Sequence, residues 1–168
     1  MWQGEIQEHV WYEGFVLSAA KIDGNGEAAR DFAMVLQEME ASLSLRKIKS
    51  SLERLNCSAD TKALLMDLAQ ITFKVGEKII SVGRKVISFA LDLVQRFPNT
   101  TFGLVVGLTL SVLVSSIPLL GLVLGPLLTP LFLAFGLSMG ALADFKDIGV
   151  RSRISELEQK FAIISTKA

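Results

Sequence analysis

The chain has 168 residues, of which 51% are hydrophobic and 20% are charged, and its 17 acidic residues balance its 17 basic ones. A net charge of zero argues against DNA or RNA as the main partner, because no long-range positive field attracts a nucleic acid. The mean hydropathy of +0.46 is high for a soluble domain of this size. The single cysteine, Cys57, excludes an intramolecular disulfide.

The first expected element is an amphipathic helix over about Glu5–Ala20. Its aromatic residues suit either a position on membrane headgroups or packing against neighbouring helices. We expect no cleavable signal peptide, since the first residues lack a basic stretch followed by an apolar one. Asp23-Gly24-Asn25-Gly26 predicts a turn and not a calcium loop, because an EF-hand starting at Asp23 would need Gly and Glu where Ala28 and Met34 stand.

Two longer helices are expected before the middle of the chain, over Glu27–Leu55 and Asp60–Phe97. The apolar stripe of the first shifts around Ser42–Leu45. In the second, apolar residues recur in steps of three and four, as in a coiled coil, so this seam should meet a helix of the same chain or of another copy. The seam consists of Leu64, Leu68, Ile71, Val75, Ile79, Val82, Val86, Phe89 and Leu93.

The segment Phe97–Ala143 contains no charged residue. As one helix it would measure roughly 70 Å, which is too long for one crossing of a bilayer core of about 30 Å and suits two crossings. We therefore predict a transmembrane hairpin with spans at about Thr101–Leu120 and Leu127–Ala143. The turn is expected between them and involves Pro118, Gly121, Gly125 and Pro126.

Small residues recur every four positions in the first predicted span and again in the second. In lipid, close approach of backbones through small side chains is a main way in which helices associate. These residues therefore predict tight helix packing within the hairpin or between copies. They are Gly103, Gly107, Ser111, Ser115, Gly136 and Gly140.

The sequence thus predicts an all-α integral membrane protein, in which an amphipathic helical bundle carries a two-span hydrophobic hairpin. Residues 1–97 form the cytoplasmic helices, residues 98–143 the hairpin, and residues 144–168 a helix that packs back on the bundle. Basic residues flank the hairpin on both sides, which predicts that both termini are cytoplasmic.

The uncharged hairpin carried by amphipathic helices is similar in outline, over Thr101–Ala143, to the C-terminal domain of pore-forming colicins. The spacing Pro126-x-x-x-Pro130 also resembles the end of the proline knot of oleosins, although Pro118 stands eight residues before Pro126 instead of seven. The first resemblance implies insertion and pore formation, and the second implies a hairpin held in one leaflet.

Enzymatic function is not expected. The one histidine, His9, has no neighbours that would form a metal site or a nucleophile–base pair, and the chain has no phosphate-binding glycine loop. We therefore predict no catalytic, metal or cofactor site.

Three functional hypotheses follow. The first is a self-assembling membrane protein whose copies form a homo-oligomeric pore or membrane-perturbing assembly, as in a toxin, bacteriocin or immunity effector. The second is a membrane-anchored adaptor that binds a partner protein through its N-terminal helices. The third is a monotopic hairpin protein. The lipid bilayer is the expected partner in all three, and nucleic acid in none.

Overall fold

The structure is a computed structural model that describes residues 26–167. The helix predicted over Glu5–Ala20, His9 and the first three residues of the predicted Asp23–Gly26 turn lie outside the described residues. The chain divides into two compact units, residues 1–38 and residues 39–168, and each is considered by itself. The described chain is mostly helical, which confirms the prediction that the protein is all-α.

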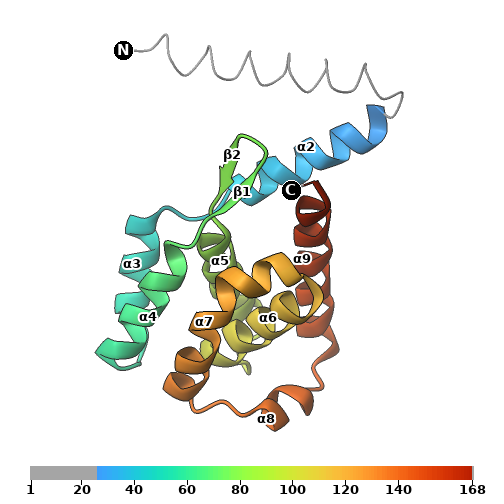
Figure 1. The fold of residues 1–168 in the computed structure, drawn as a ribbon. Helices are drawn as coiled ribbons and strands as arrows, with labels where there is room; N and C mark the ends of the chain where they lie inside the picture. Colours follow the sequence, from blue (N-terminus) through green and yellow to red (C-terminus); the bar gives the residue numbers. More distant parts are fainter. Residues whose placement is uncertain (1–25, 168) are drawn as a thin grey trace. The chain divides into compact units, whose positions relative to one another are not determined.

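The described elements are labelled in Figure 1. They are α2 (Gly26–Glu40), α3 (Leu45–Glu53), α4 (Ala59–Ala69), β1 (Phe73–Val75), β2 (Lys78–Ile80), α5 (Val82–Arg96), α6 (Phe102–Ser116), α7 (Pro118–Phe135), α8 (Met139–Ala143) and α9 (Ile148–Lys167). All elements from α3 onward belong to the second unit.

The helix predicted over Glu27–Leu55 is divided into α2 and α3. The division falls where the apolar stripe shifts, and its local cause is Ser44. The backbone of Ser44 is extended, and its hydroxyl accepts a hydrogen bond of 3.4 Å from the Lys47 N–H, so it caps a new helix. Ser58 begins α4 in the same way and accepts from the Thr61 N–H at 3.1 Å.

The prediction of one continuous helix over Asp60–Phe97 is wrong. The chain forms α4, a β-hairpin and α5 instead, with Val75 paired to Lys78 across the hairpin. Aromatic and β-branched residues, which favour strands, lie on both sides of a turn at Gly76. The φ of Gly76 is +59°, which glycine adopts without steric cost. The helical spacing of the apolar residues therefore continues through a segment that is not helical.

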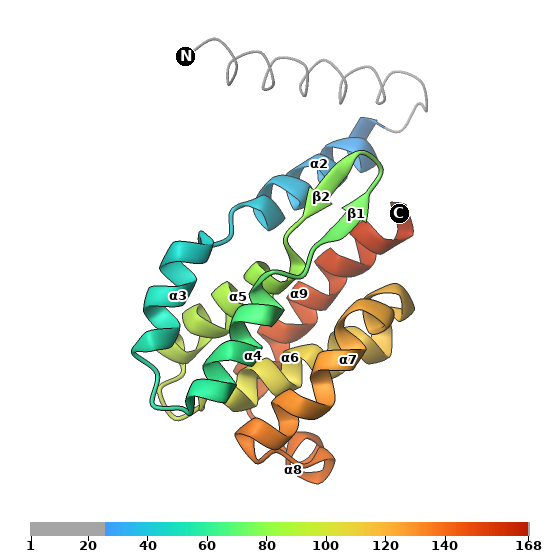
Figure 2. The ribbon, with the colours of Figure 1, turned by 60° about the vertical axis from the view of Figure 1, so that its left-hand side comes forward.

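Helix α6 lies in the interior of the second unit. It packs against α7, α5, α9 and α8, and Figure 2 shows it among these helices. Helix α4 packs against α5 and α7, and α3 covers α4 and α5. The approach of α5 to α4 is very close at Gly83, because a Cβ there would collide with the backbone carbonyl of Leu68. The core is thus built around an uncharged helix.

Helix α9 contacts α6 and β1. One stripe of it is buried, and this stripe comprises Val150, Ile154, Leu157, Phe161 and Ile164. The helix is preceded by Asp147, whose Oδ1 accepts hydrogen bonds from the N–H groups of Gly149 and Val150 at 2.9 and 3.1 Å. Arg151 donates to the carbonyls of Phe145 and Ala143 at 2.5 and 3.2 Å, and so ties the start of α9 to the end of α8.

Candidate functional site

The candidate functional site is the pair of uncharged helices α6 and α7. The bend between them is at Ile117, so the turn predicted around Gly121–Pro126 is wrong in position. Pro118 occupies the first position of α7. Proline is favoured there because a backbone N–H at this position would have no hydrogen-bond partner within the helix. The other predicted turn residues, Gly121, Gly125 and Pro126, lie inside α7.

Most of α6 is buried: nine of its 15 residues have little or no contact with solvent. Its first turn is capped by Thr101, whose hydroxyl accepts a hydrogen bond of 3.4 Å from the Leu104 N–H. The one fully buried hydroxyl of the helix belongs to Thr109 and donates to the carbonyl of Val105 at 2.8 Å. This buried hydroxyl therefore has its hydrogen-bond partner within the helix.

The two helices approach closely where α6 carries glycine. A Cβ at Gly103 would lie 2.7 Å from Cγ of Phe135, at the end of α7. A Cβ at Gly107 would lie 3.5 Å from the ring of Phe132 in α7 and 2.6 Å from Cδ1 of Leu137, which follows α7. The rings of Phe102 and Phe135 meet edge to face, with centroids 6.4 Å apart and an interplanar angle of 70°. These contacts hold the start of α6 against the end of α7.

The other predicted small residues have different surroundings. Ser111 is half-buried, and Ser115 is exposed at the end of α6. Gly136 ends α7 with a φ of +63°, the left-handed conformation of a helix C-cap. Gly140 is exposed in α8. Of this set, Gly103 and Gly107 therefore lie at close contacts with the end of α7 and the residues that follow it.

Helix α7 has the same apolar composition as α6 but a different environment. Its buried residues are Leu120, Leu124 and Leu131, which share one side of the helix. On the opposite side, Leu122 is 79% exposed and Leu133 is 75% exposed. We call this side the outer face, and it comprises Leu119, Leu122, Pro126, Thr129 and Leu133.

The outer face could not be predicted from the sequence, because residues on all sides of this segment are almost uniformly apolar. Its members are spaced by three and four residues, and the buried residues Leu120, Leu124 and Leu131 also recur at helical spacing, in steps of four and seven. One available signal was Pro126, because a proline inside a helix leaves a backbone carbonyl without its helical partner, and such a carbonyl is costly to bury.

By length and composition, α7 is the one helix among residues 26–167 that could cross a membrane. Helix α6 is apolar but shorter, at 15 residues, and the second span predicted over Leu127–Ala143 is interrupted at Gly136. The structure thus supports one candidate span, where the sequence predicted two.

The predicted seam is dispersed over several elements. Leu68, Val75, Val82, Val86 and Leu93 are buried within the second unit, and Leu64, Ile71 and Phe89 are half-buried. Ile79 in β2 is 67% exposed. A row of apolar residues that was expected to meet a partner helix is mostly covered by the chain itself.

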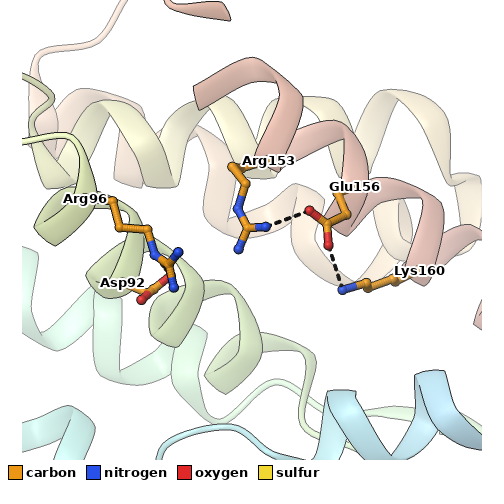
Figure 3. A network of polar contacts seen from close by, with 5 residues as sticks. All are labelled: Asp92, Arg96, Arg153, Glu156 and Lys160. Atoms are coloured by element: carbon orange, nitrogen blue, oxygen red, sulfur yellow. Dashed lines mark hydrogen bonds and ion pairs between the residues drawn. The ribbon is translucent and has the colours of Figure 1, made fainter. Parts of the chain in front are cut away.

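Figure 3 shows ion pairs on α5 and α9, the two helices that pack against α6 together with α7 and α8. On α5, Arg96 pairs with Asp92 at 2.9 Å, and on α9, Glu156 accepts from Arg153 at 2.8 Å and Lys160 at 3.1 Å. The hydrogen bond from Lys160 lowers the pKa of Glu156, and the charges of Lys160 and Arg153 add to this effect. These exposed pairs contribute little to stability.

Within the part of the chain that the structure describes, no group of three His, Cys, Asp or Glu side chains is placed to hold a metal ion. Comparison of the chain with protein-family models, curated proteins and solved structures finds no match. The physical properties of α6 and α7 are therefore what indicates the function of this chain.

Proposed function

We propose that this protein binds a lipid bilayer through the outer face of α7, inserts the α6–α7 pair, and assembles with other copies into a pore. The observation that carries the proposal is that an uncharged helix of 18 residues has only three of them buried. Burying a leucine side chain contributes roughly 1.5–3 kcal/mol, so an exposed row of leucines favours an apolar partner. An uncharged helix of this length matches the bilayer in particular.

Helix α6 is the second inserting element in this proposal. It carries no charge, and the residues from Phe97 to its start are uncharged as well. Its length of about 22 Å is less than the bilayer core of about 30 Å, so these flanking residues or local thinning of the bilayer would complete the crossing. Insertion requires α6 to leave α5 and α9, because both pack against it.

Self-association of copies is supported by the C-terminal part of the row of small residues in α6, where exposure to solvent increases. Gly103 and Gly107 are occupied by contacts with Phe135 and Leu137, whereas Ser115 is exposed and Ser111 is half-buried. In lipid, small side chains of this kind allow two helices to approach closely. The predicted seam supports self-association less, since most of it is covered within the unit.

A membrane-anchored adaptor is the second candidate, and one observation favours it. Because α6 belongs to the core of the second unit, the unit can stay folded while only α7 rests on the membrane. In that case the bilayer would be contacted but not permeabilised, and the remaining surface would bind a partner protein.

Membrane binding is tested by sedimentation of the protein with liposomes. The double variant Leu122→Glu with Leu133→Glu should keep its circular dichroism and melting temperature, because both side chains are exposed, and should lose binding. The matched control is Ile79→Glu with Ile148→Glu, which changes two leucine-sized side chains that are 67% and 83% exposed elsewhere. Equal binding by both double variants would contradict the role of α7.

Release of a small dye from liposomes then separates a pore from an anchor. A pore predicts release that rises steeply with protein concentration and falls sharply in Ser111→Ile with Ser115→Ile. Binding without release would favour the adaptor.

A further inference from the structure

Helix α3 carries the densest group of basic residues among residues 26–167. Its buried side, with Ile48 and Leu52, packs against α4 and α5. The opposite side is exposed and holds four basic residues and one acid, Glu53. We call this side the basic face. Its basic residues are Arg46, Lys47, Lys49 and Arg54, the last of which directly follows the helix.

Neither ion pairing nor helix stability explains the charges of the basic face. Among residues 26–167, the ion pairs involve basic residues of β2, α5 and α9, and none involves the basic face. Arg46 and Lys47 lie in the first turn of α3, which contains no acid. The positive end of the helix dipole disfavours cations there. These charges are therefore unmatched by the described part of the chain and suit an anionic partner.

The two compact units of the chain differ in charge. Residues 1–38 contain seven acidic and two basic residues, which gives a net charge of −5. Residues 39–168 contain ten acidic and 15 basic residues, which gives +5. The zero net charge of the whole chain therefore hides an asymmetry that is typical of proteins that interact with membranes or nucleic acids. The positive unit is the one that carries the outer face of α7.

The outer face of α7 favours a membrane over a nucleic acid as the anionic partner. Helices α3 and α7 both pack against α4, and Figure 2 shows α4 between them. The exposed Leu122 and Leu133 of α7 would gain little from a nucleic acid, whose outer surface is a row of phosphates. A bilayer with anionic lipids offers both chemistries, because negative headgroups cover its hydrocarbon.

On this basis, which rests on the proposed function, we infer that the basic face of α3 directs this protein to bilayers that contain anionic lipids. The negative potential of such a surface attracts basic residues over about a Debye length, about 8 Å at physiological ionic strength. This attraction acts before contact, so α3 raises the rate of encounter and the affinity. Burial of the outer face of α7 then holds the protein at the membrane. Lipid selectivity is thus a property of α3, and binding to any bilayer is a property of α7.

Sedimentation of the full chain with liposomes tests this inference. Two compositions are compared, phosphatidylcholine alone and phosphatidylcholine with roughly one third phosphatidylserine. The variant is Lys47→Gln with Lys49→Gln. Its matched control is Lys74→Gln with Lys146→Gln, which removes the same charge from two exposed lysines, one in β1 and one before α9. Both variants should keep the melting temperature of the parent, because all four side chains are exposed.

At about 0.1 M salt, the parent should bind the anionic vesicles at least about tenfold more tightly than the neutral ones. At about 1 M salt, where the Debye length is about 3 Å, this preference should disappear. Lys47→Gln with Lys49→Gln should lose on the order of tenfold in affinity for the anionic vesicles and nothing for the neutral ones. The control should lose less than about threefold on the anionic vesicles.

Equal binding of the parent to both compositions, or an equal loss in variant and control, would overturn this inference and leave membrane binding through α7 standing. Displacement of the parent from anionic vesicles by an equal concentration of single-stranded DNA would assign the basic face to nucleic acid and overturn the inference as well. Absence of binding to either composition would overturn the proposed function and this inference together.

Discussion

Helices α6 and α7 are adjacent in the sequence, equally free of charge and similar in composition, yet one is enclosed by the fold and the other has an open face. Helix α6 is surrounded by α5, α7, α8 and α9, while α7 is contacted mainly by α6 and α4. The difference teaches that hydrophobicity alone does not define a membrane span. An uncharged helix can serve as the core of a helical unit, and its neighbours decide which role it has in water.

The largest difference in stability between the two helices should appear when a leucine is truncated to alanine in each of them. Leu110 in α6 is fully buried, so Leu110→Ala should lower the free energy of unfolding by about 3 kcal/mol through lost burial and a cavity. Leu122 in α7 is 79% exposed, and Leu122→Ala should change it by less than about 0.5 kcal/mol. Urea titration of both variants measures the difference, and equal losses would mean that α7 is as enclosed as α6.

A second pair of variants compares two positions of the small-residue row. Gly107→Ile should destabilise the fold by about 2 kcal/mol, because a Cβ at Gly107 lies 2.6 Å from Leu137 and 3.5 Å from Leu142. The same isoleucine at Ser115, which is exposed, should cost less than about 0.5 kcal/mol. Thermal unfolding is a sufficient measurement. A Gly107→Ile protein as stable as the parent would show that α6 packs loosely against Leu137 and Leu142, which follow α7.

A smaller effect on stability is expected from the residue that precedes each helix. Thr101 caps α6 with its hydroxyl, whereas α7 begins after Ile117 without a side-chain cap. Thr101→Ala should therefore lower stability by about 1 kcal/mol, and Thr101→Ser should restore most of the loss because serine caps equally well. Chemical denaturation of the two variants tests this, and identical stabilities would remove the cap from the account of α6.

The smallest effect concerns α9, which covers α6. The lowered pKa of Glu156 means that its pairing stabilises the fold above its ordinary pKa of 4.5, and that this contribution is lost as the pH falls through the lowered value. Because the side chain is 47% exposed, Glu156→Gln should cost only about 0.3 kcal/mol at pH 7 and less at pH 3. Unfolding of parent and variant at the two pH values measures this difference. A loss that is undiminished at pH 3 would have another cause.

Helical content and the uncharged middle segment could be read from the sequence, because periodicity and the absence of charge are local properties. The break at Phe73–Ile80 could not, since its apolar residues keep helical spacing and only Gly76 and the β-branched residues nearby signal a hairpin. The bend was misplaced because four prolines and several glycines offered competing positions. The burial of α6 depends on contacts with α5 and α9, which periodicity does not specify.

The single residue Ile117 between α6 and α7 restricts how the pair can move. One residue spans about 3.5 Å, so neither helix can travel far from the other at this end. Nor can the two readily join into one straight rod, because Pro118 lacks the N–H that such a rod would need and its ring disfavours a helical conformation for Ile117. The two helices therefore remain bent relative to each other at Ile117. Any force that draws α7 away from the unit is transmitted through Ile117 directly to the end of α6.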